Sequence, residues 1–123
     1  MPVTSTASAT VQHIWYVPIN ITIKSCNVWL GQDAADGDTV KFSVMSYAID
    51  SSNGTTSGDL SDGTEVCVSP STIVGAGREQ AYFQQMTISS ANVNSGRVIM
   101  ACVSQNGTNS DITANMQLVW AAR

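Results

Sequence analysis

The sequence predicts an all-β protein whose strands pack as an antiparallel β-sandwich, and three observations lead to this prediction. Short apolar stretches rich in β-branched and aromatic residues recur along the 123-residue chain, separated by turns of Gly, Asn, Asp and Ser. Several stretches alternate apolar and polar side chains, as strands with one solvated face do. No segment repeats apolar residues at the spacing of a capped helix. Many short strands without helices form a sandwich or a barrel.

The chain is expected to consist of a short polar arm and one domain. Residues 1–10 are small and polar, so they are predicted to form an extended arm. The sandwich domain is predicted to span residues 11–123, because no change of composition marks a linker. Its first strand is expected over Val11–Val17, and Pro18 ends it, since proline is poorly tolerated inside a sheet.

The second strand, expected over Ile21–Leu30, contains a switch in its apolar pattern. Apolar residues occupy one phase before Ser25 and the other phase from Cys26 onward, which predicts a β-bulge at this point. Trp29 then falls on the opposite face from its two apolar neighbours. It is therefore expected to be the exposed indole of the chain.

Two of the later strands carry information about position. Val98–Val103 is apolar in both phases, which is typical of a strand covered on both faces and predicts a central place in its sheet. Ile112–Trp120 alternates strictly, which predicts a one-faced strand with Trp120 buried. About eight strands joined by long loops predict a jelly-roll-like sandwich. The other strands are expected over Thr39–Ile49, with a bend near Tyr47, and over Val66–Val68 and Tyr82–Ile88.

The composition argues against several kinds of partner. Charged residues make up 11% of the chain, against about 25% in an average domain, and the net charge is −4. The five cations are scattered, whereas a phosphate backbone requires clustered positive charge, so no nucleic acid is expected. No apolar run could span a bilayer, and the first residues do not resemble a secretory signal. Uncharged polar surfaces of this kind are common in β-rich proteins that contact other proteins or sugars.

Three cysteines are an odd number, and none of them forms a C-x-x-C motif. Cys26, Cys67 and Cys102 each lie in an apolar stretch, where a free thiol behaves as a small buried hydrophobe. We expect unpaired thiols and assembly in a reducing cytoplasm, with one disulfide or a metal site as the alternatives.

No set of catalytic residues can be assembled from the sequence. Nucleophilic catalysis by Ser or Cys requires a general base, usually His, and the chain has only His13, inside the first strand. Glycoside hydrolysis requires paired carboxylates, and the two glutamates, Glu65 and Glu79, both lie beside loops. The protein is therefore expected not to be an enzyme and to use no cofactor.

The acidic turns are the best metal candidates. Asp33, Asp36 and Asp38 cluster in one turn, and calcium prefers carboxylate and carbonyl oxygens from such loops. A second acidic cluster is formed by Asp59, Asp62 and Glu65. The EF-hand spacing is absent from both, and Asp and Gly also occur in turns for conformational reasons. Ordinary turn chemistry is the favoured interpretation, and the calcium site is the alternative.

Three features are candidates for contact with a partner: Trp29, the long loop Asp50–Gly63 and the N-terminal arm, residues 1–10. An exposed Trp marks a protein interface more often than a sugar site, so Trp29 is expected to contact a partner, with core packing and sugar stacking as alternatives. The long polar loop Asp50–Gly63 is a second candidate, because loops of this length are often functional. Within it the expected contact residues are Asn53, Asp59 and Asp62.

The arrangement of strands and turns resembles the small β-sandwich structural proteins of tailed bacteriophages. The resemblance lies in the stretches GQDAADGDTVKFSV, GDLSDGTEVCVSP and VNSGRVIMACVSQNGT and in the terminal strand ANMQLVWAAR, which together span most of the chain. It implies a virion component assembled in the host cytoplasm, and in particular a head decoration (cement) protein. The implied partners are the major capsid protein and copies of the chain itself, as a homotrimer. A small tail or fibre protein, or a carbohydrate-binding module contacting the host surface, is the alternative.

Overall fold

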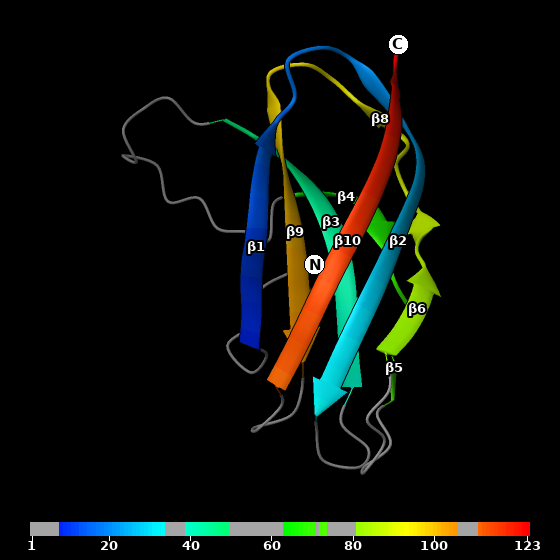
Figure 1. Ribbon diagram of the computed structural model, residues 1–123. Coiled ribbons are helices and arrows are strands. Elements are labelled where there is room, and N and C mark those ends of the chain that lie inside the picture. The colour runs from blue at the N-terminus through cyan, green and yellow to red at the C-terminus, as the bar shows by residue number, and fades with distance from the viewer. Residues whose placement is uncertain (1–7, 34–38, 50–62, 71, 74–80, 106–110) are drawn as a thin grey trace, which may run out of the picture.

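The computed structural model describes residues 8–33, 39–49, 63–70, 72–73, 81–105 and 111–123, and this part of the chain folds as two packed antiparallel sheets (Figure 1). One sheet has the order β1-β9-β3-β4-β7, with β5 paired to β3; the other has the order β10-β2-β6, with β8 paired to β2. The predicted all-β antiparallel sandwich is therefore confirmed. The strands are β1 (Ser8–Tyr16), β2 (Ile21–Asp33), β3 (Thr39–Ala48), β4 (Thr64–Val68), β5 (Thr72–Ile73), β6 (Ala81–Gln85), β7 (Thr87–Ile88), β8 (Asn92–Val93), β9 (Arg97–Gln105) and β10 (Asp111–Ala122).

The described residues form ten strands rather than about eight, because three of them (β5, β7 and β8) are only two residues long. One expected strand, Tyr82–Ile88, is divided at Met86. The Met86 amide donates a hydrogen bond to the Cys26 carbonyl in one sheet, while β7 pairs with β4 in the other sheet. The chain changes sheets here because the Met86 side chain turns into the core, where it is 4% exposed.

The bulge expected near Ser25–Cys26 is present one residue earlier. In the pairing of β2 with β10, Ser25 lies opposite Val119 and Ile23 lies opposite Trp120, so Lys24 is the extra residue. The extra residue reverses the facing of the strand. As a result Ile23 and Cys26, which are an odd number of positions apart, both point into the core.

β9 holds the central position that its apolar pattern predicts. It lies between β1 and β3, and both neighbours run antiparallel to it (Figure 1). Its Ile99 and Val103 point into the core between the sheets. On its other face Val98, Met100 and Cys102 pack with Met45 and Tyr47 of β3 in a second apolar cluster.

The second cluster explains the phase change near Tyr47. The bend expected there is absent from the β3–β9 pairing, which continues without a register shift to Ala48, although the β3–β4 pairing shifts between Val44 and Met45. Val44 belongs to the main core and Tyr47 belongs to the second apolar cluster on the other face. Apolar residues therefore occupy both phases of β3, because both of its faces are covered.

The main core fills the space between the sheets. Its largest fully buried side chains come from both layers and from the β1–β2 connection: Val17, Ile21, Val28, Leu30, Val40, Phe42 and Val66. β1 begins at Ser8, so strand pairing includes the last residues of the segment expected to be an arm, and residues 1–7 lie outside the described part. The described residues contain no helix long and apolar enough to cross a membrane.

Candidate binding surfaces

Of the predicted partner-contact residues, the structure describes only Trp29. Its side chain is 41% exposed on the outer face of β2. The other three, Asn53, Asp59 and Asp62, lie outside the described residues, as do Asp36 and Asp38 of the calcium candidate.

The remaining candidates for metal binding or catalysis form no cluster where they are described. Asp33 ends β2 opposite Asp111, but its side chain, like that of His13, is outside the described part. Glu65 accepts a hydrogen bond of 2.6 Å from the Ser89 hydroxyl. Among the side chains that are described, no three His, Cys, Asp or Glu residues lie close enough together to hold a metal ion.

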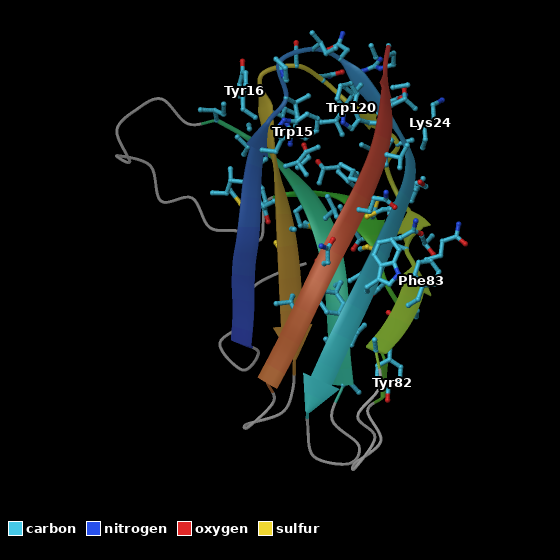
Figure 2. The ribbon with its side chains drawn as sticks, in the orientation of Figure 1. Trp15, Tyr16, Lys24, Tyr82, Phe83 and Trp120 are labelled. Carbon is cyan, nitrogen blue, oxygen red and sulfur yellow. The ribbon has the colours of Figure 1, made fainter. Side chains whose placement is uncertain are left out.

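The outer face of the β10-β2-β6 sheet carries an exposed aromatic pair. Trp29 of β2 lies directly opposite Phe83 of β6 in the strand register, and their ring centroids are 5.2 Å apart with the planes tilted by 50°. Phe83 is 56% exposed. The two rings therefore form one apolar platform on a polar sheet face. Figure 2 shows Phe83 projecting from β6, well away from Trp15 and Trp120.

Side-chain amides surround this aromatic platform. On the β10 side Asn115 lies opposite Trp29 and Gln117 lies opposite Asn27, while on the β6 side Gln85 also pairs with Asn27. Three of the four amides are exposed, and Asn27 is half-buried. Each amide offers both donors and an acceptor.

Small residues lie beside the Trp29 ring. Gly31 follows Trp29 on the same face of β2 and lies between Ala81 of β6 and Thr113 of β10. The space above Gly31 is open, because a Cβ atom placed there would meet no atom within 4 Å. The Gly31–Ala81 pair therefore leaves room beside the platform.

A second candidate surface is the open edge of the sandwich between β1 and β10. Trp15 of β1 and Trp120 of β10 meet there across the gap between the sheets, with ring centroids 5.5 Å apart (Figure 2). Beneath them is a cleft of about 270 Å³ that reaches into the core. Its walls are formed by Trp15, Cys26, Val44, Ile99, Ala101, Met116, Leu118 and Trp120.

The burial expected for Trp120 was wrong. Its phase was assigned correctly, because it lines the inter-sheet cleft with Met116 and Leu118, yet it is 43% exposed. The reason is topological: β1 and β10 are edge strands of different sheets, and among the described residues no strand closes the gap between them. An inward-facing residue at such an edge stays open to solvent.

Further apolar side chains extend the open edge on both sides. Ile14 and Tyr16 are exposed on β1, and Val119 is exposed on β10. Ile14 and Tyr16 lie opposite Met100 and Val98 of β9, which places them beside the second apolar cluster. Four of the large apolar side chains that are exposed in the described part of the chain, Ile14, Tyr16, Val119 and Trp120, thus lie on the two strands that border the edge.

The three cysteines are free thiols, and all are buried. Cys26 of β2 and Cys67 of β4 come from opposite sheets, and their side chains are hydrogen-bonded. The Cys26 thiol also donates to the Met86 sulfur at 3.3 Å. The hydrogen bond to Cys26, together with burial, raises the pKa of Cys67, and burial raises the pKa of Cys102. The hydrogen bond from Cys67 lowers the pKa of Cys26, so for that thiol it is burial that limits access by a reagent.

The sequence did not indicate that two residues of these surfaces are exposed. Trp120 was expected to be buried, and Phe83 was not among the candidate residues. The alternation Tyr82, Phe83, Gln84, Gln85 contains no signal for which ring faces outward, since both phases begin with an aromatic. The register with Trp29, a residue far away in sequence, provides the answer.

Comparisons of the chain with protein-family models, with curated proteins and with solved structures found no match.

Proposed function

We propose that this protein is a capsid decoration protein of a tailed bacteriophage, and that it binds the head shell through the open edge between β1 and β10. The observation that carries the proposal is the Trp15–Trp120 pair over an apolar cleft at this edge, with Ile14 and Tyr16 exposed on the adjoining outer face of β1. Exposed apolar patches of this kind mark protein interaction sites, in which aromatic anchors fill pockets of the partner or receive its side chains.

The backbone at this edge supports the same proposal. Within the described sheet β1 pairs only with β9, so its other side presents N–H and C=O groups that a partner strand can use. An extended segment of a capsid subunit, or of a second copy of the chain, would add to β1 and place its side chains near the cleft. Copies arranged in this way would form the homotrimer that the resemblance implies.

The composition is compatible with this role in the virion. A shell-binding protein requires contact area and not a reactive group, and the low charge of the chain limits the desolvation of ions on binding. The alternative is a small tail or fibre protein, which would use the same edge against a different part of the particle. Localisation of the chain on the particle separates the two.

Binding to phage heads that lack the protein tests the proposal. The purified chain should co-sediment with such heads, and cryo-electron microscopy should locate its density on the shell. A variant with Ile14→Ser and Trp120→Ser should bind at least about tenfold more weakly, because both anchors of the edge are lost. The matched control is Phe83→Ser, which removes an exposed ring from the other surface and should bind normally.

Density of the protein on the tail, with none on the head, would contradict the decoration role and support the role of a tail or fibre protein. Unchanged head binding by the double variant would show that the β1–β10 edge is not the contact.

A further inference from the structure

We infer that the outer face of the β10-β2-β6 sheet is a binding site for a neutral oligosaccharide, with Trp29 and Phe83 as the stacking platform. This inference goes beyond the role at the shell and concerns a different surface. Trp120 of the open edge is paired with Ile23, six residues before Trp29 on β2, which is roughly 20 Å along a strand. A protein attached through its edge would leave this face available.

The aromatic pair provides the apolar part of a sugar site. One face of a pyranose ring is lined by C–H groups, which pack against aromatic rings and cover apolar surface. Trp29 and Phe83 lie side by side with centroids 5.2 Å apart, so together they span about the length of one sugar ring and the start of the next. Both rings come from paired strands rather than loops, so the backbone positions that carry the platform are fixed before the ligand binds.

The amides provide the polar part. Sugar hydroxyls are both donors and acceptors, and a carboxamide is the uncharged side chain that matches them in both respects. Asn115 lies directly beside Trp29, and Gln117, Asn27 and Gln85 continue the amide surface toward the bulge. Within the described part of the chain none of these four amides is engaged in a side-chain hydrogen bond, so each can turn to a ligand.

The charge of this face selects among possible ligands. From Ser25 to Gly31 on β2, and at the positions opposite on β6 and β10, no outward-facing residue is charged. Protein interfaces are enriched in Arg and surrounded by a polar rim, and acidic glycans require cations. A surface of aromatic rings and amides alone fits a neutral sugar best.

The open space above Gly31 fits an extended chain rather than a single sugar. The Gly31–Ala81 pair lies two residues along the strands from the Trp29–Phe83 pair, on the same face. A second sugar unit can lie over Gly31 and Ala81 while the first unit stacks on the platform. An oligosaccharide should therefore bind more tightly than its monosaccharide.

Titration calorimetry with defined sugars tests the site. The probes are cellohexaose, laminarihexaose, mannohexaose and chitohexaose, with hexagalacturonic acid as the acidic comparator. At least one neutral hexasaccharide should bind, with at least about tenfold loss in Trp29→Ala and again in Phe83→Ala. The control Trp120→Ala, which removes an equally exposed indole from the open edge, should bind the sugar normally. Asn115→Ala should weaken binding by a smaller factor.

Three results would overturn the inference: no binding of any of the four neutral sugars, full binding by the Trp29→Ala, Phe83→Ala double variant, or preference for the acidic sugar. Because both rings are exposed, these variants are expected to fold, and thermal melting verifies this. The two proposals can fail independently. A protein that binds heads but none of the sugars would contradict only the sugar site, and a protein that binds a neutral sugar but not heads would contradict only the role at the shell.

Discussion

Cys67 donates its thiol proton to Cys26 across the gap between the two sheets, and Cys26 donates in turn to the sulfur of Met86. Three sulfur atoms thus form a short hydrogen-bonded chain in the centre of the core. Sulfur groups are polarisable and fill irregular space well, so they suit a point where β2, β4 and the β6–β7 connection meet.

Alkaline pH should destabilise the protein through Cys67. Its pKa is raised in the folded state, so the unfolded thiol, with a pKa of about 8.5, loses its proton while the folded thiol retains it. The stabilising contribution is complete below that pH and declines above it, by about 1.4 kcal/mol per pH unit. Urea unfolding between pH 7 and 9.5 measures this slope. Cys67→Ala should have a shallower slope, and an equal slope in the variant would contradict the assignment.

All three thiols should be unreactive in the folded protein. Each is buried, and a thiol must be exposed and ionised to attack a reagent. An aromatic disulfide reagent at about pH 7.5 should label no cysteine in the native protein. It should label all three cysteines after the protein is unfolded in about 6 M guanidinium chloride. Fast labelling of one thiol in the native protein would show that the core opens locally at that site.

Gly63 should be intolerant of any side chain. A Cβ atom at this position would enter the ring of Tyr47 at Cε1 and Cζ, and that ring is buried in the second apolar cluster. Gly63→Ala should cost about 1–3 kcal/mol of unfolding free energy, as overpacking does. Gly31→Ala is the matched control, because its Cβ meets open space and alanine is favoured over glycine in a strand. A control that loses as much stability as Gly63→Ala would remove the steric explanation.

Two buried serines should respond to alanine in opposite ways. The Ser69 hydroxyl accepts a 2.8 Å hydrogen bond from the Phe42 amide and donates one of 3.0 Å to the Pro70 carbonyl. Its removal leaves a buried amide unpaired, so Ser69→Ala should cost about 1–3 kcal/mol. Within the described residues the Ser43 hydroxyl has no partner although Ser43 is fully buried. Ser43→Ala should therefore be neutral or stabilising, and thermal melting of both variants compares them directly.

Local pattern was sufficient to predict the longer strands and the approximate place of the bulge. The phase switch near Ser25 is a local signal, because an inserted residue changes the facing of all apolar residues after it. The double-sided apolar pattern of Val98–Val103 likewise predicts a central strand, as β9 is. These features depend on residues adjacent in sequence.

The candidate surfaces could not be predicted in the same way, because they depend on which strands become neighbours. Trp29 was expected to be exposed from its phase alone, but its partner Phe83 is brought beside it by the pairing of β2 with β6. Trp120 has the phase of a core residue, and only the strand order places it at an unclosed edge. Strand order is a long-range property that alternation within one strand does not encode.

The pairing of the first strands with the last ones determines when this chain can fold during its synthesis. β1 hydrogen-bonds to β9, and β2 hydrogen-bonds along its length to β10, the final strand. Both strands emerge from the ribosome long before their partners exist, so neither sheet can be completed until β9 and β10 have been synthesised. Folding of the sandwich is therefore slow, in the range of roughly milliseconds to seconds that is typical of sandwiches dominated by distant contacts. Until then the apolar residues of β2 remain exposed in the nascent chain, which makes this interval the period of greatest risk of aggregation.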